Sequence, residues 1–138
     1  MGDVARPPGQ KRTKKPSQIP MPDPNIIDPE AIATLRELNP DDNGAFLREI
    51  IGIYVEDTPR RLQELKSSLA AGDIALFTRT AHTIKGSSAN VGARTLASIA
   101  ERLESMSRKE GLGGLGSLVA DCEAQFGLAE AELRSLLA

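Results

Sequence analysis

The sequence predicts an all-α fold, an antiparallel four-helix bundle with an additional short N-terminal helix. Apolar residues recur at spacings of three and four along most of residues 27–138, which is the period of an amphipathic helix. No segment alternates apolar and polar residues in the way that a half-buried strand does. Several amphipathic helices joined by short loops bury their apolar faces by packing as a bundle.

The first helix is expected to begin after Asp28, because Asp is a good N-cap and Pro29 suits the first helical position. Ile32 and Leu35 then share one face, and the helix should stop at residues 39–40. It is the short helix that precedes the bundle.

The second helix should begin near Asp41 or Asp42 and end at Gly72, which is a common C-terminal stop. Pro59 falls inside its apolar pattern. Because proline lacks a backbone donor, we expect the helix to kink there or to split at Thr58.

Asp73 should cap the third helix, Gly92 should mark the turn after it, and the fourth helix should end before Gly111. The apolar stripe of the third helix comprises Ile74, Phe77, Ala81, Ile84, Ser88 and Val91. The stripe of the fifth comprises Leu115, Leu118, Val119, Cys122, Phe126, Ala129, Leu133, Leu136 and Leu137. The residues expected at the centre of the core are Leu47, Ile50, Ile51, Leu65, Phe77, Ile84, Leu103 and Phe126.

Residues 1–26 are rich in proline and basic residues and are predicted to be a disordered tail or a linker, so that residues 27–138 form the domain. Residues 1–24 carry five Lys or Arg and two Asp, whereas residues 25–138 carry twelve basic and seventeen acidic side chains. Nucleic-acid binding through the tail is therefore a weak alternative, because the predicted domain is acidic.

Several other functional classes lack the residues that they need. One cysteine and one histidine make neither an internal disulfide nor a metal site, so Cys122 is expected to be a small buried residue. Residues 111–116 match the glycine pattern of dinucleotide-binding loops but have no strand before them, so a plain loop is expected. Glu101 and Glu104 are expected on a solvated face. We predict no metal and no cofactor.

His82 is placed at the edge of the buried stripe of the third helix and should be exposed. Its neighbours one turn away are Thr78, Arg79, Lys85 and Gly86. A neutral imidazole is a good nucleophile near neutral pH. A phosphoryl group on the ring would bring negative charge that Lys85, and Arg79 on the other side, could balance.

Gly86 removes a side chain beside His82, although a glycine inside a helix costs about 1 kcal/mol relative to alanine. Ser87, next to it, is also small. We therefore expect this face to leave room for a docking partner, with Thr78, Arg79, Gly86 and Ser87 in contact with it.

Residues 81–92, Ala-His-Thr-Ile-Lys-Gly-Ser-Ser-Ala-Asn-Val-Gly, resemble the signature of the histidine-containing phosphotransfer (HPt) family. The resemblance covers roughly residues 28–137 and includes segments 54–59 and 70–73. It implies the bundle described above, phosphorylation of His82 on Nε2, and Lys85 as the charge partner. It also implies that Gly86 is the gap for a receiver domain. Such domains have no kinase site of their own. The family pattern has Leu where this chain has Ile84.

The resulting hypothesis is a cytoplasmic phosphorelay carrier that accepts a phosphoryl group on His82 from one receiver aspartate and passes it to another. Its partners would be a response-regulator receiver domain and a hybrid sensor kinase, with no small-molecule substrate, no membrane and a monomeric state. The alternative is a helical module that is not phosphorylated and sequesters a receiver or kinase. The identity of the partners, the direction of flow and the tail's role stay open, as does whether the chain is a free protein or part of a kinase.

Overall fold

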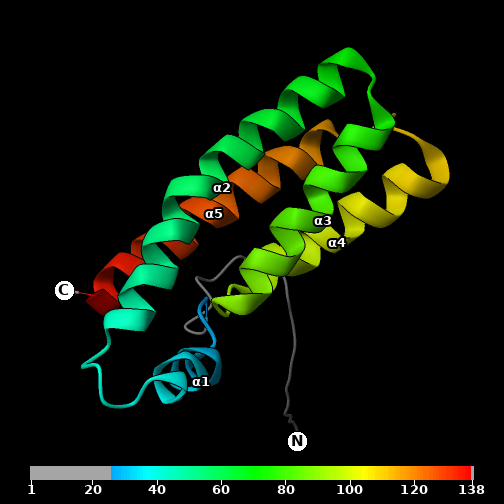
Figure 1. The fold of residues 1–138 in the computed structure, drawn as a ribbon. Coiled ribbons are helices and arrows are strands. Elements are labelled where there is room, and N and C mark those ends of the chain that lie inside the picture. Colours follow the sequence, from blue (N-terminus) through cyan, green and yellow to red (C-terminus); the bar gives the residue numbers. More distant parts are fainter. Residues whose placement is uncertain (1–25, 138) are drawn as a thin grey trace, which may run out of the picture.

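The computed structural model describes residues 26–137, and within them it contains five helices and no strand. Four helices run antiparallel as a bundle, and the short first helix lies at one end of it (Figure 1). The all-α fold class is thus confirmed. The predicted disordered tail, apart from Ile26, lies outside the described residues. The helices are α1 (Pro29–Leu38), α2 (Ala45–Ala71), α3 (Ile74–Asn90), α4 (Arg94–Glu110) and α5 (Gly116–Leu137).

Side-chain caps set the starts of α1 and α3 as expected. The Asp28 carboxylate accepts a hydrogen bond from the backbone of Glu30 at 3.0 Å, and Asp73 accepts one from Leu76 at 3.1 Å. α2 begins later than predicted, at Ala45, because the carboxylate of Asp42 accepts hydrogen bonds within the preceding turn as well as from the first turn of the helix. An aspartate that closes a turn in this way delays the helix.

The prediction that Pro59 could split the second helix is wrong, because α2 runs without a break from Ala45 to Ala71. Pro59 itself is exposed, while Thr58, Leu62 and Leu65 beside it are buried. The proline removes a single backbone hydrogen bond. Burial of the side chains on both sides of it holds the helix together.

The core follows the predicted seams except near the helix ends. Of the eight residues expected at its centre, seven are buried and Ile50 is half-buried. Three members of the predicted stripes are exposed instead, with exposed fractions of 46% for Ile74, 37% for Leu136 and 36% for Leu137. They lie in the first turn of α3 and the last turn of α5.

Polar contacts tie α2 to α3 inside the bundle. The hydroxyl oxygens of Tyr54 and Ser88 lie 2.8 Å apart, and Thr80 donates to a carboxylate oxygen of Glu64 at 2.9 Å. Burial raises the pKa of Tyr54 to about 12. These bonds satisfy hydroxyl groups that would otherwise be costly to bury.

The turn between α3 and α4 also holds the start of α1. Gly92 has a positive φ of 83°, and its carbonyl accepts a hydrogen bond from the backbone of Asp28 at 2.8 Å. The same glycine therefore closes the α3–α4 hairpin and anchors the N-terminal cap. None of the five helices is both long and apolar enough to cross a membrane.

Candidate functional site

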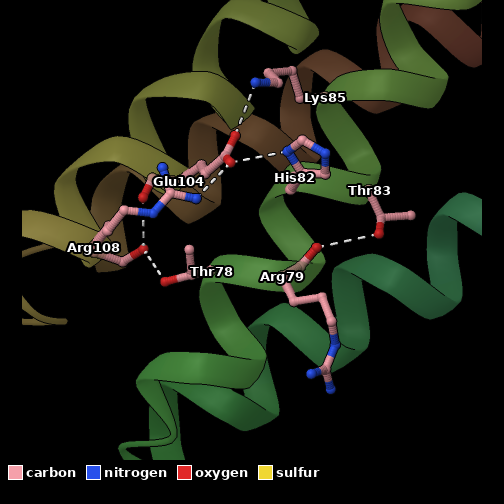
Figure 2. Close-up of polar contacts among 8 residues, drawn as sticks. Thr78, Arg79, His82, Thr83, Lys85, Glu104 and Arg108 are labelled. Atoms are coloured by element: carbon pink, nitrogen blue, oxygen red, sulfur yellow. Dashed lines mark hydrogen bonds and ion pairs between the residues drawn. The ribbon is translucent and has the colours of Figure 1, made fainter.

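His82 projects from α3 toward solvent, as the sequence predicts, and 65% of its side chain is exposed. Its Nδ1 atom is not free, however, because it lies 2.9 Å from Oε2 of Glu104 on α4 (Figure 2). The other ring nitrogen, Nε2, is on the side of the ring opposite this contact. The imidazole is thus held at one nitrogen and open at the other.

The expectation that Glu104 lies on a solvated face is wrong. Only 8% of its side chain is exposed, and its carboxylate meets His82 and Lys85 from α3 and Arg108 from its own helix. Glu101, one turn earlier, is exposed as expected. Glu104 is one turn from the buried Ala100, so it lies at the edge of the α4 seam, where it faces α3.

The ionisation state of Glu104 assigns the tautomer of His82. Burial alone would raise the pKa of this carboxyl group, but Lys85, Arg108 and His82 together lower it to about 2. A carboxylate that is ionised at neutral pH can only accept a hydrogen bond. In the neutral ring, Nδ1 therefore carries the proton, and Nε2 presents its lone pair to solvent.

Two cations share the carboxylate with the histidine. Lys85 Nζ lies 3.0 Å from Oε1, an ion pair that falls outside hydrogen-bond geometry, and an Arg108 NH₂ donates to Oε2 at 2.8 Å. Lys85 is half-buried, whereas Arg108 is 63% exposed. The lysine predicted to balance a phosphoryl group is therefore already paired with Glu104.

Thr78 and Arg79, which precede His82 by about one turn, differ in their surroundings. The hydroxyl of Thr78 lies 2.7 Å from that of Ser107, which in turn donates to the backbone carbonyl of Glu104 at 3.1 Å. Arg79 is exposed, and within residues 26–137 no carboxylate forms an ion pair with it. Thr78 thus supports the helix that carries Glu104, and Arg79 presents an unneutralised charge.

Gly86 and Ser87 lie on the following turn of α3. Gly86 is exposed, and a Cβ atom placed on it would meet nothing within 4 Å. Ser87 is half-buried, and its hydroxyl donates to the backbone of Ile84 at 3.4 Å. The bundle itself does not require a glycine at position 86, so the open surface there is available to another molecule.

A shallow hollow of about 520 Å³ lies beside the histidine, between α3 and α4. Its lining consists of apolar side chains near the start of α3 and of polar and charged side chains from α3 and α4. The lining residues are Ile74, Ala75, Thr78, Arg79, His82, Glu104 and Arg108. The sequence pattern placed Ile74 in the core, but this side chain is exposed and lines the hollow next to His82.

Other sequence candidates stay outside this site. Cys122 is buried in the core, and burial raises the pKa of its thiol to about 12. The glycine-rich stretch 111–116 is a loop up to Leu115 and joins α4 to α5, as predicted. Within residues 26–137 no group of three His, Cys, Asp or Glu residues could hold a metal ion.

Comparison with known proteins gives one family match, one relative and two similar solved structures. A family model described as the Hpt domain matches residues 49–138. Over 82 residues the chain is 29% identical to multistep phosphorelay regulator 1 of Schizosaccharomyces pombe, a match that covers 59% of this chain and 28% of the relative. The chain therefore corresponds to a minor part of that regulator.

Two solved structures share the fold. Histidine-containing phosphotransfer protein B of Pseudomonas aeruginosa superposes with a TM-score of 0.73 and 28% identity, covering 82% of this chain and 95% of that chain. The HPT domain of a sensor hybrid histidine kinase from Shewanella gives a TM-score of 0.62 at 17% identity, covering 77% of this chain and 91% of that one.

Proposed function

Because this chain belongs to the Hpt domain family, we propose that it is a phosphorelay carrier whose phosphorylated residue is His82. It accepts a phosphoryl group from the aspartate of one receiver domain and passes it to the aspartate of another. The observation that carries the proposal is the hydrogen bond between Nδ1 of His82 and the buried carboxylate of Glu104. Because this bond occupies Nδ1, Nε2 is left as an exposed nucleophile. The domain acts as an intermediate and relies on its partners for kinase activity.

Lys85 is proposed to balance the charge of the phosphoryl group. It lies one turn from His82 on α3 and is paired with Glu104, which holds its ammonium group near the ring. A positioned cation lowers the cost of bringing a phosphoryl dianion to the ring. Arg79, which lies on the other side of His82 without an ion pair in the described region, is proposed to attract the acidic pocket of the receiver.

The receiver is proposed to dock on the exposed face of α3. The hollow beside His82 offers an apolar floor at Ile74 between Arg79 and Arg108, which suits a partner with an acidic pocket and apolar side chains at its rim. Gly86 and Ser87 leave room on the next turn. We place the protein in the cytoplasm as a monomer, with a response-regulator receiver domain and a hybrid sensor kinase as its partners.

The test is phosphotransfer from phosphorylated receiver domains to the wild-type chain, to His82→Gln and to Glu101→Gln. Glu101 is an exposed residue of α4 and serves as a matched control. We expect an acid-labile, base-stable label on the wild type and on Glu101→Gln and no label on His82→Gln. If several receivers leave the wild type unlabelled but bind it, the proposal is wrong and the chain is a binding module.

A further inference from the structure

We propose that Glu104 keeps the Nδ1 proton on the phosphorylated ring, so that His82 carries its phosphoryl group as a phosphoimidazolium ready to be transferred. This inference rests on the proposed function and concerns the state of the ring between two transfers. It makes Glu104 a positioning residue that acts through Nδ1 and does not touch the phosphoryl group.

The first step starts from the neutral ring, with its proton on Nδ1 and a lone pair on Nε2. Nε2 attacks the phosphorus of an aspartyl phosphate, the Nε2–P bond forms, and the P–O bond to the aspartate breaks with its electron pair leaving on the carboxylate. The ring then carries one positive charge and still has its Nδ1 proton. That proton either passes to water or stays in the hydrogen bond to Glu104, which is 2.9 Å long in the resting state.

The surroundings of the ring favour keeping the proton. The charged groups beside it are Lys85 and Arg79 from α3, and Glu104 and Arg108 from α4. Of these groups, Glu104 is the one hydrogen-bonded to the ring, and its negative charge, together with about two negative charges on the phosphoryl group, favours a positively charged ring. Loss of the Nδ1 proton would remove the positive charge that faces this carboxylate. It would also leave the carboxylate without its only donor from the ring.

The onward step then needs no proton from outside. The carboxylate of the next receiver attacks phosphorus, the Nε2–P bond breaks, and its electron pair returns to Nε2. Because Nδ1 is protonated throughout, the leaving group is a neutral imidazole, a better leaving group than the imidazolate that an unprotonated ring would give. The imidazole ring binds one proton before and after each transfer. The phosphoryl group can therefore move from aspartate to His82 or from His82 to aspartate without uptake or release of a proton.

The chain offers a clean spectroscopic test, because His82 is its single histidine. We would label the full chain with ¹⁵N-histidine, phosphorylate the ring with phosphoramidate, and follow the ring nitrogens by NMR across a pH series. Phosphoramidate needs no protein partner, so failure of this inference is distinguishable from failure of the proposed relay. The variants are Glu104→Gln, the exposed control Glu101→Gln, and Arg108→Gln.

In the wild type and in Glu101→Gln, we expect Nδ1 of the phosphorylated ring to stay protonated to a pH at least one unit higher than in Glu104→Gln. A one-unit shift is a tenfold change in proton affinity. Arg108→Gln should move the midpoint the other way, to higher pH, because Arg108 donates to the same Oε2 atom that accepts from the ring. Arg108 is 63% exposed, so this variant keeps its fold and provides a test even if Glu104→Gln unfolds.

Equal midpoints in the wild type and a folded Glu104→Gln would overturn the inference. An unchanged or lowered midpoint in Arg108→Gln would also overturn it. A merely structural role for Glu104 would change stability but would not produce shifts of opposite sign in these two variants.

Discussion

Gly92 provides a quantitative test of how the α3–α4 turn is built, with Gly72 as its control. Both glycines have a positive φ, 83° at Gly92 and 72° at Gly72, so alanine at either position costs about 1–2 kcal/mol of backbone strain. They differ in the space around them. A Cβ on Gly72 meets nothing within 4 Å, whereas a Cβ on Gly92 would lie 2.9 Å from the Cβ of Ala31 and 3.0 Å from the carbonyl oxygen of Asp28.

Gly92→Ala should therefore destabilise the domain by about 1–3 kcal/mol more than Gly72→Ala, the typical cost of inserting a methyl group into a packed site. The extra loss corresponds to a melting temperature lower by roughly 4 °C for each kcal/mol, since the described part is slightly over 100 residues long. Urea and thermal unfolding followed by circular dichroism would measure both quantities.

A second comparison separates the contact from the backbone strain. Ala31→Gly removes the nearest atom that the new Cβ meets, so Gly92→Ala should cost less in that background than in the wild type. If Gly92→Ala and Gly72→Ala lose the same stability, the contact with α1 is energetically irrelevant and the reasoning is refuted.

Three further predictions concern buried polar groups. Tyr54→Phe should lower the free energy of unfolding by about 1–2 kcal/mol, because the buried hydroxyl of Ser88 loses its partner at 2.8 Å, and a Ser88→Ala background should remove most of that loss in urea unfolding. Cys122 should react with a thiol reagent at pH 8 only after unfolding, since burial raises the pKa of its thiol to about 12; equal rates for the native and the denatured chain would contradict this. The pKa of Glu104 is lowered from 4.5 to about 2 on folding, so its carboxylate contributes stability above pH 4.5 that is lost as the pH falls toward 2. Acid titration of Glu104→Gln should show a flatter decline over that window, and identical curves would argue against the contribution.

The local features of the fold could be predicted from the sequence because short-range chemistry determines them. The caps Asp28 and Asp73 and the glycine stop at position 72 follow from the hydrogen bonds that helix ends require. The effect of Pro59 could not be predicted in this way. Whether a helix continues through a proline depends on how much the neighbouring residues bury, which is a property of the assembled bundle.

The site was predictable to the extent that it lies on one helix. The exposure of His82 and the closeness of Lys85 follow from helical spacing. Glu104 was missed because it is 22 residues from His82, and its role depends on how α4 is rotated against α3. One signal in the sequence could have indicated its burial. Glu104 is one helical turn from the apolar seam residue Ala100, so it lies on the same side of the helix as the seam.

Within residues 26–137, the side chains that contact His82, or the groups holding it, come from the single helical hairpin formed by α3 and α4 (Figure 2). The other three helices supply the wall against which the hairpin rests and much of the outer surface. Substitutions on α1, α2 and α5 can consequently change the packing and stability of the bundle while the bonds around the imidazole stay the same. The proposed docking face lies on the same hairpin, so recognition and chemistry are encoded in one stretch of the chain, and a substitution there can change both.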